Sequence, residues 1–160
     1  MAMYMKIDGI DGEATAVGHD KWVDIDSITW GTNRALSSNT GTSQDREGTL
    51  ANVQDVTITK LMDVTSPAIF QESVVGKSKT VQFHIAKQGS DGPEVYMEYT
   101  LTNAMISGYQ VSAAGDSGRP MESLSFNFTK VEMKYTPYDD QHNAGTPVPA
   151  GFDSTTGNKI

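Results

Sequence analysis

The sequence predicts a mainly β protein, a compact antiparallel β-barrel of two sheets with one short α-helix at about residues 66–75. Many segments alternate apolar and polar residues with a period of two, as strands do when they bury one face. Three of these segments change phase partway along. Because a slip of one residue turns every side chain of a strand over, a phase change predicts a bulge or a strand that moves from one sheet to another. Both features are typical of barrels and orthogonal sandwiches.

Three segments alternate without interruption and are predicted to be half-buried antiparallel strands. They are DVTITK, VQFHIA and EVYMEYTLTN. Their expected inward faces consist of Val56 and Ile58 in the first, Val81, Phe83 and Ile85 in the second, and Val95, Met97, Tyr99 and Leu101 in the third.

The phase changes fall at three places. In WVDIDSITW the apolar parity switches near Asp26, and in ESLSFNFTKVEMKY it switches near Thr129. A third slip is expected near Asn103, before Ile106. At each of these positions we expect either a bulge or a passage between sheets.

One segment carries helix signals. TSPAIFQESVVGK offers Ser66 as the N-cap, Pro67 as the first helical residue and Gly76 as the stop. Phe70 and Val74 are four residues apart, so they should share one face of the helix.

Three other segments are predicted to be irregular. They are the polar stretch 31–51, the turn Gly115–Pro120 and the tail that begins at Pro137. A polar loop as long as the first is usually functional or disordered. We therefore divide the chain into a barrel domain, residues 1–136, and a polar C-terminal tail, residues 137–160.

Composition limits the function. The 160 residues suit one domain, and the net charge of -8 argues against binding nucleic acid or an anionic membrane surface. The absence of cysteine excludes disulfides, thiolate catalysis and cysteine-ligated zinc. No apolar run approaches the ~20 residues of a membrane-spanning helix, and the N-terminus has no signal-peptide pattern. We expect the protein to be made in the cytoplasm. We expect that it does not insert into a membrane.

The string GDSGRP, residues 115–120, resembles the nucleophile loop of trypsin-like serine proteases. A nucleophilic Ser117 would need a histidine and an orienting carboxylate in the order of that family. His19 and His84 precede it but lack the family's sequence context, and Arg119 replaces a glycine. Because Gly, Asp, Ser and Pro are turn formers between two long strands, we interpret the string as a hairpin turn.

No metal site or cofactor is expected. Asp8, Asp11 and Glu13 are close in sequence, but Ile10 stands where a calcium loop of the EF-hand type has a ligand. No buried titratable pair is visible, so we expect no enzyme. The histidines lie in separate segments without metal-ligand spacing and are expected to be solvated: His19, His84 and His142.

Several strings, taken in order, resemble the Hcp family of type VI secretion tube proteins. They are KIDGIDGEA and ITWG near the start, ANVQDVTITKLMDVTSPAIFQESVVGK in the middle, and ESLSFNFTKVEMKYTPYD followed by AGTPVPAGFD near the end. The middle string is the most specific, and the resemblance covers essentially the whole chain.

The resemblance implies a structural tube subunit rather than an enzyme. It implies a homohexameric ring with ring stacking, and a tube that contacts a VgrG spike, a contractile sheath and a baseplate. It also implies effector proteins in the channel, and secretion through the machine without a signal peptide. Two alternatives stay open: a contractile-phage-like tail tube protein, and a monomeric small-ligand-binding β-barrel. Bulky residues predict a filled interior that argues against the second: Phe83, Leu101, Phe126 and Phe128.

A hexamer of this chain would carry a formal charge of -48, which opposes assembly. Assembly must therefore rest on shape, apolar contact and backbone pairing. The loop 31–51 is the first candidate for reaching a neighbouring subunit, and the hairpin tip is a weaker candidate for contact between rings. The candidate contact residues are Arg34, Asp45, Arg46 and Glu47 in the loop, and Asp116 and Arg119 at the tip.

Overall fold

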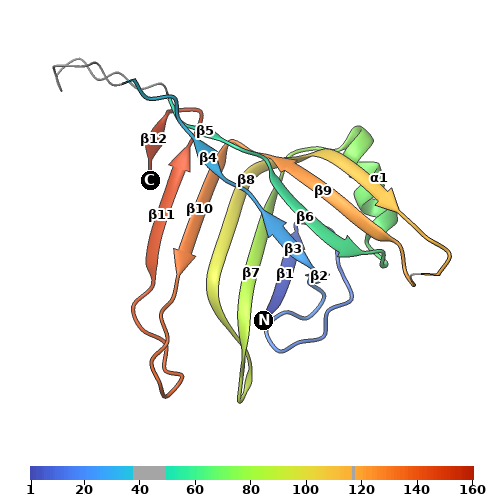
Figure 1. Ribbon diagram of the computed structural model, residues 1–160, viewed down its shortest axis with the longest axis horizontal. Helices are drawn as coiled ribbons and strands as arrows, with labels where there is room; N and C mark the ends of the chain where they lie inside the picture. The colour runs from blue at the N-terminus through green and yellow to red at the C-terminus, as the bar shows by residue number, and fades with distance from the viewer. Residues whose placement is uncertain (38–49, 117) are drawn as a thin grey trace.

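The computed structural model describes residues 1–37, 50–116 and 118–160, and the mainly β architecture is confirmed (Figure 1). Two antiparallel sheets share one long strand. Sheet A has the order β12-β11-β10-β8-β7-β1-β2 and sheet B the order β3-β6-β9-β8. The strands of sheet A are β1 (Ala2–Ile7), β2 (Val23–Ile25), β7 (Lys79–Gly89), β8 (Gly92–Ser112), β10 (Lys130–Tyr135), β11 (Val148–Asp153) and β12 (Asn158–Lys159). Those particular to sheet B are β3 (Ser27–Thr29), β6 (Val56–Leu61) and β9 (Met121–Asn127).

All three phase changes are passages from one sheet to the other. The chain leaves β2 of sheet A and enters β3 of sheet B across Asp26. Strand β8 pairs with β7 and β10 up to Ala104 and with β9 from Met105 onward. Asn103, at this change, has a φ of 54°, in the left-handed region. The chain returns from β9 to β10 around Thr129.

The core lies between the two sheets and includes Val56, Ile58, Val81, Phe83 and Leu101 of the predicted inward faces. Val95, which was predicted on the same face as Leu101, packs instead against a smaller cluster that contains Tyr4 and Ala86. Met5, Ile58 and Leu101 are fully buried, and Phe83 meets Phe126 edge to face with ring centroids 5.9 Å apart. The expected filled interior is therefore observed; Phe128 packs against the same core but is only partly buried. Each such side chain contributes about 1.5–3 kcal/mol through its burial.

The helix α1 (Ser66–Val75) has the predicted extent but a different cap. Thr65 occupies the N-cap position and makes no side-chain capping hydrogen bond, while Ser66 is the first helical residue. Ile69 is the fully buried side chain of α1. Phe70 and Val74 are both exposed, so the shared face that they form points to solvent.

Two of the segments expected to be irregular contain strands. The stretch 31–51 begins at β4 (Thr32–Asn33), which pairs with β5 (Asn52–Val53). In the tail, β11 pairs with β10 over six residues and β12 pairs with β11. The expectation of an irregular tail is thus wrong, although the division at residue 136 stays a prediction.

The segment between β8 and β9 is a hairpin connection, as predicted. Ser112 pairs with Met121 at its base, and Gly118 has a φ of 80°. Ser117 lies outside the described residues.

Candidate functional site

A cluster of polar side chains is buried between sheet B and α1. Lys60 Nζ lies 2.5 Å from Glu122 Oε1 and 3.1 Å from Asp63 Oδ1. Ser66 Oγ donates to Glu122 Oε1 at 2.8 Å, and Tyr109 Oη donates to Glu122 Oε2. Lys60 and Glu122 both have 0% exposed surface. The cluster joins β6, β9, β8 and the start of the helix around one carboxylate.

The cluster follows from the strand register. Lys60 has the same parity as the buried Val56 and Ile58, and Glu122 has the same parity as the buried Leu124. Lys60 and Glu122 are direct cross-strand partners in the β6–β9 ladder. The expectation that no buried titratable pair exists is therefore wrong. A signal was present, because each charged residue continues the apolar parity of its strand.

The electrostatics of the cluster favour an ionised Glu122. Burial raises the pKa of Glu122, but hydrogen bonds from Lys60, Tyr109 and Ser66 outweigh it and hold the pKa below its ordinary value. Burial and the hydrogen bond to Glu122 raise the pKa of Tyr109 to about 12. Both carboxylate oxygens of Glu122 are engaged, so the cluster fastens the helix to sheet B.

A second cluster brings together two histidines, His19 and His84, which lie in separate segments of the sequence. His19 Nε2 lies 2.9 Å from His84 Nδ1. The His19 ring stacks on Tyr4 at 4.3 Å and meets Trp22 edge to face at 4.9 Å. His84 Nε2 lies 3.2 Å from Glu98 Oε1. His19 is only 3% exposed, so the expectation of solvated histidines is wrong for this residue.

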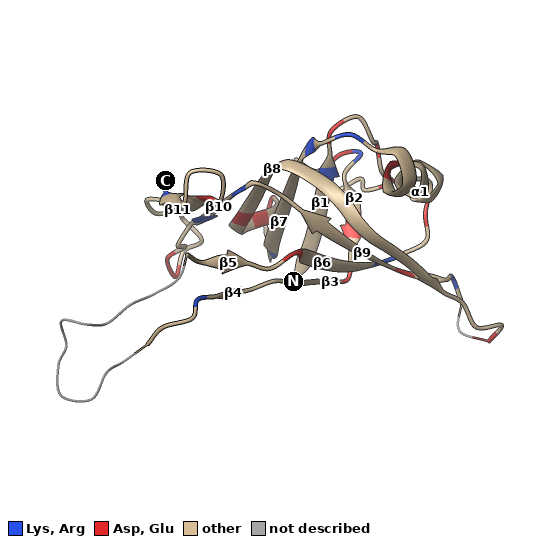
Figure 2. Cartoon of the chain, turned by 90° about the horizontal axis from the view of Figure 1, so that it is seen from above, with Lys and Arg blue, Asp and Glu red and all other residues tan. Residues whose placement is uncertain are grey.

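These two clusters hold no metal-binding constellation. Within the described ranges, no three side chains of His, Cys, Asp or Glu come together in a way that fits a metal ion. In the part of the chain that the structure describes, Lys and Arg residues are scattered over several elements (Figure 2).

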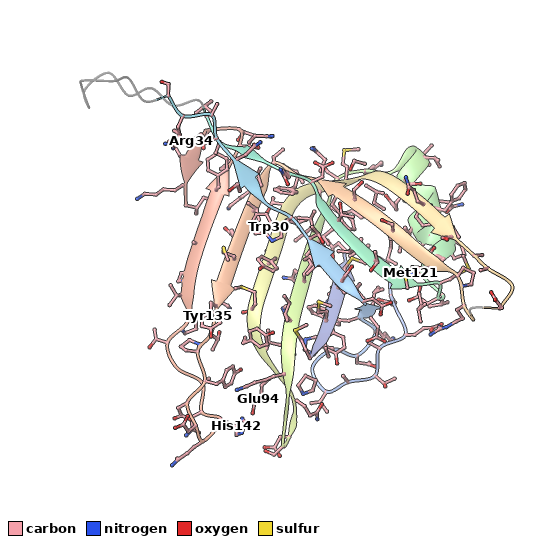
Figure 3. All side chains as sticks on the ribbon, in the orientation of Figure 1. Trp30, Arg34, Glu94, Met121, Tyr135 and His142 are labelled. Carbon is pink, nitrogen blue, oxygen red and sulfur yellow. The ribbon has the colours of Figure 1, made fainter. Side chains whose placement is uncertain are left out.

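The predicted contact residues are not brought together. Arg34 follows β4 and is exposed, while Asp116 and Arg119 are exposed in the hairpin between β8 and β9. Figure 3 shows Arg34 at the opposite end of the molecule from Met121, which follows that hairpin. Arg119 Nη1 donates to the Met62 carbonyl at 3.3 Å. Asp45, Arg46 and Glu47 lie outside the described residues.

Two apolar surfaces are open to solvent. A cavity of about 270 Å³ lies between the β3–β4 segment and the β10–β11 pair. Its apolar lining includes Trp30, Val53, Val131, Met133 and Phe152. Around the helix, the exposed apolar side chains are Val64, Phe70, Val74 and Val75.

Comparison with known proteins identifies the family. The family model described as "Type VI secretion system effector, Hcp" matches residues 4–135, which span β1 to β10. The chain belongs to the Hcp family. Hcp1 of Pseudomonas aeruginosa is 27% identical over 152 residues, which is 94% of this chain and 93% of that protein.

Solved structures agree with this assignment. One, titled as the structure of a type six secretion system protein, matches with a TM-score of 0.91 and 31% identity, covering 99% of each chain. Hcp1 from Salmonella typhimurium has a TM-score of 0.78 and 22% identity, covering 99% of this chain and 98% of that one. The second likeness concerns the fold alone.

As an Hcp protein, the chain is a structural tube subunit of the type VI secretion system, as the resemblance implied. The family also implies ring assembly and secretion by this system. Over the described ranges, α1 is far too short to cross a bilayer as a helix, and no other helix qualifies.

Proposed function

We propose that this Hcp chain assembles into homohexameric rings, and that stacked rings form the inner tube that is propelled into a target cell. The ring channel carries and protects effector proteins. The tube contacts a VgrG spike at its tip, a contractile sheath around it and a baseplate beneath it. The observation that supports the proposal is the match of the whole two-sheet barrel to the Hcp family.

We propose further that the subunit is not an enzyme and needs no cofactor. Support comes from the Lys60–Glu122 cluster, because both residues have 0% exposed surface and hydrogen bonds engage both carboxylate oxygens of Glu122. The protein is made in the cytoplasm and leaves through the secretion machine. It inserts into no membrane and binds no nucleic acid.

The proposed contact residues form two groups, and Arg34 of the first group lies at the opposite end of the molecule from the hairpin that carries the second (Figure 3). Arg34, with Asp45, Arg46 and Glu47, serves contact to a neighbouring subunit, and Asp116 and Arg119 serve contact between rings. The exposure of Arg34, Asp116 and Arg119 supports this assignment.

The test is the mass of the purified protein by light scattering coupled to size exclusion, with negative-stain images of the same fractions. A mass of six subunits and ring-shaped particles is the expected result. A monomer at every protein concentration would contradict the proposal. Arg34→Ala is expected to shift the mass toward monomer, and Asp116→Ala to leave rings intact but shorten their stacks. Variants that assemble as the parent does would remove these residues from the interface.

A further inference from the structure

We propose that the His19–His84 contact is an acid-released latch that holds segment 11–22 against sheet A. The segment connects β1 to β2 and lies over a small core separate from the main one. This small core consists of Tyr4, Ala14, Trp22 and Ala86. Opening the segment would expose it while leaving the main core between the sheets in place.

Besides the histidine pair, the segment is held by the packing of Ala14 and Trp22 and by the Val64 N–H, which donates to Glu13 Oε1 at 3.3 Å. Its ends are joined by Gly12 N–H to the Lys21 carbonyl at 2.7 Å and by Ala14 N–H to the Trp22 carbonyl at 3.0 Å. Gly18 and Lys21 have positive φ angles of 80° and 65°. A side chain in the left-handed region stores strain, so Lys21 favours release once the latch is lost.

The hydrogen bond between the two imidazole rings requires that at least one ring is neutral, because only an unprotonated ring nitrogen can accept. When His84 carries its proton on Nε2, that N–H donates a hydrogen bond to Glu98 Oε1 at 3.2 Å. His84 Nδ1 is then the acceptor, and His19 Nε2 donates to it at 2.9 Å. Each ring in this arrangement is neutral, and both atoms of the contact are satisfied.

The contact tolerates one added proton and not two. If His84 becomes an imidazolium, its Nδ1–H donates to His19 Nε2, and His19 can place its own proton on Nδ1, 3.4 Å from the Val17 carbonyl. If both rings are protonated, two N–H donors and two positive charges face each other at 2.9 Å. The doubly protonated pair must separate, and His19 is the partner on the movable segment.

The charged groups around the pair do not offset this repulsion. Glu98, which would favour an imidazolium, is shared with Lys134, whose Nζ lies 2.7 Å from Glu98 Oε2. Lys6 Nζ lies 5.9 Å from the centroid of the Trp22 ring and adds a further positive charge. The titratable and charged groups facing the pair are Tyr4 and Lys6 of β1, Asp24 of β2, Glu98 of β8 and Lys134 of β10.

The titration of the pair agrees with this geometry. Burial lowers the pKa of His84 to about 4. The charge of Glu98 acts in the opposite direction, while His19 and Lys134 lower the pKa further. Burial also lowers the pKa of His19, although the hydrogen bond to the Val17 carbonyl acts to raise it. A histidine whose pKa is lower in the closed state than in the open state takes up protons on opening. The latch is therefore fully effective above the ordinary histidine pKa of about 6.5 and weakens as the pH falls from there toward about 4.

Hydrogen exchange of the full chain, read by mass spectrometry as protection factors corrected for intrinsic rates, tests the latch. Between about pH 7 and pH 4.5, the protection of peptides from segment 11–22 should fall by about tenfold or more, while peptides from β7 and β8 keep theirs. His19→Phe keeps the ring stacked on Tyr4 but removes the titrating group, so its segment should stay protected at the lower pH. The matched control is His142→Phe, which should behave as the parent does.

Two results would overturn the proposal. One is segment protection in the parent chain that does not change with pH, or that is lost only together with the sheets by circular dichroism. The other is a His19→Phe protein with the parent's pH dependence. If His19→Phe fails to fold, imidazole NMR of the parent decides, since the chain has three histidines. His19 and His84 should titrate below the ordinary histidine pKa of about 6.5 and together with the opening, and titration of both at that ordinary value without opening would refute the latch.

Discussion

The stability of the fold depends on the pairing of the buried charges of Lys60 and Glu122. Lys60→Met alone should lower the free energy of unfolding by about 3–5 kcal/mol, because it leaves the Glu122 carboxylate buried without its counterion. Glu122→Gln alone should cost less, because Lys60 keeps Asp63 Oδ1 at 3.1 Å. The double variant should lose clearly less than the sum of the two. Urea unfolding of all four proteins at one protein concentration measures this coupling.

The partly exposed pair between Lys79 and Glu72, with 3.7 Å between Nζ and Oε1, is the matched control. Lys79→Met should change the free energy of unfolding by less than about 1 kcal/mol. Additive losses in the Lys60–Glu122 cycle would show that the two residues act independently and would contradict the structure.

These two residues also mark what can be predicted from sequence at the residue scale. Each continues the apolar parity of its strand, and their signs are opposite, so the pairing of β6 with β9 was within reach of sequence reasoning. The contact of His19 with His84 was not, because it joins a loop to a strand 65 residues away. No periodicity places a loop residue over a given strand.

At the scale of elements, Asn103 sits where β8 passes from sheet A to sheet B. Its φ of 54° is accessible to Asn but strained for a β-branched residue. Asn103→Val should therefore lower the free energy of unfolding by about 1–2 kcal/mol, and Asn103→Gly by much less. Thr102→Val, one residue earlier in the regular part of the strand, serves as control in the same urea unfolding experiment. Equal losses for Val and Gly at position 103 would rule out backbone strain as the cause.

The elements that the sequence predicted well are those with strong periodicity. Alternation predicted the long strands, and its breaks predicted where the three passages lie, although each break was equally compatible with a bulge. The strand β11 was not predicted, because VPAGFD contains Pro149 and Gly151 and has no alternation of apolar and polar residues. Such a strand is compatible with a position near the edge of a sheet, where proline is tolerated and tertiary pairing supplies the stability that local propensity lacks. The N-cap was misassigned by one residue because the Ser66 hydroxyl binds Glu122, a contact between distant segments.

For the whole molecule, assembly depends on the balance between the repulsion of the negatively charged subunits and the attractive contacts at their interfaces. A hexamer carries a formal charge of -48, so rings should form at lower protein concentration as salt rises. Raising sodium chloride from about 0.05 to 0.5 M shortens the Debye length from about 14 to 4 Å and screens this repulsion. Light scattering over a protein dilution series at each salt concentration gives the midpoint of assembly.

The direction of the salt effect separates two kinds of interface. Asp139 and Asp140 are exposed and belong to no ion pair among the described residues, so neutralising both to Asn should reduce the salt that assembly requires. If salt instead dissociates the rings, ion pairs across the interface outweigh the net repulsion. The charged residues proposed for contacts, Arg34 first among them, would then hold the ring together more than the apolar surfaces around Trp30 and Phe70.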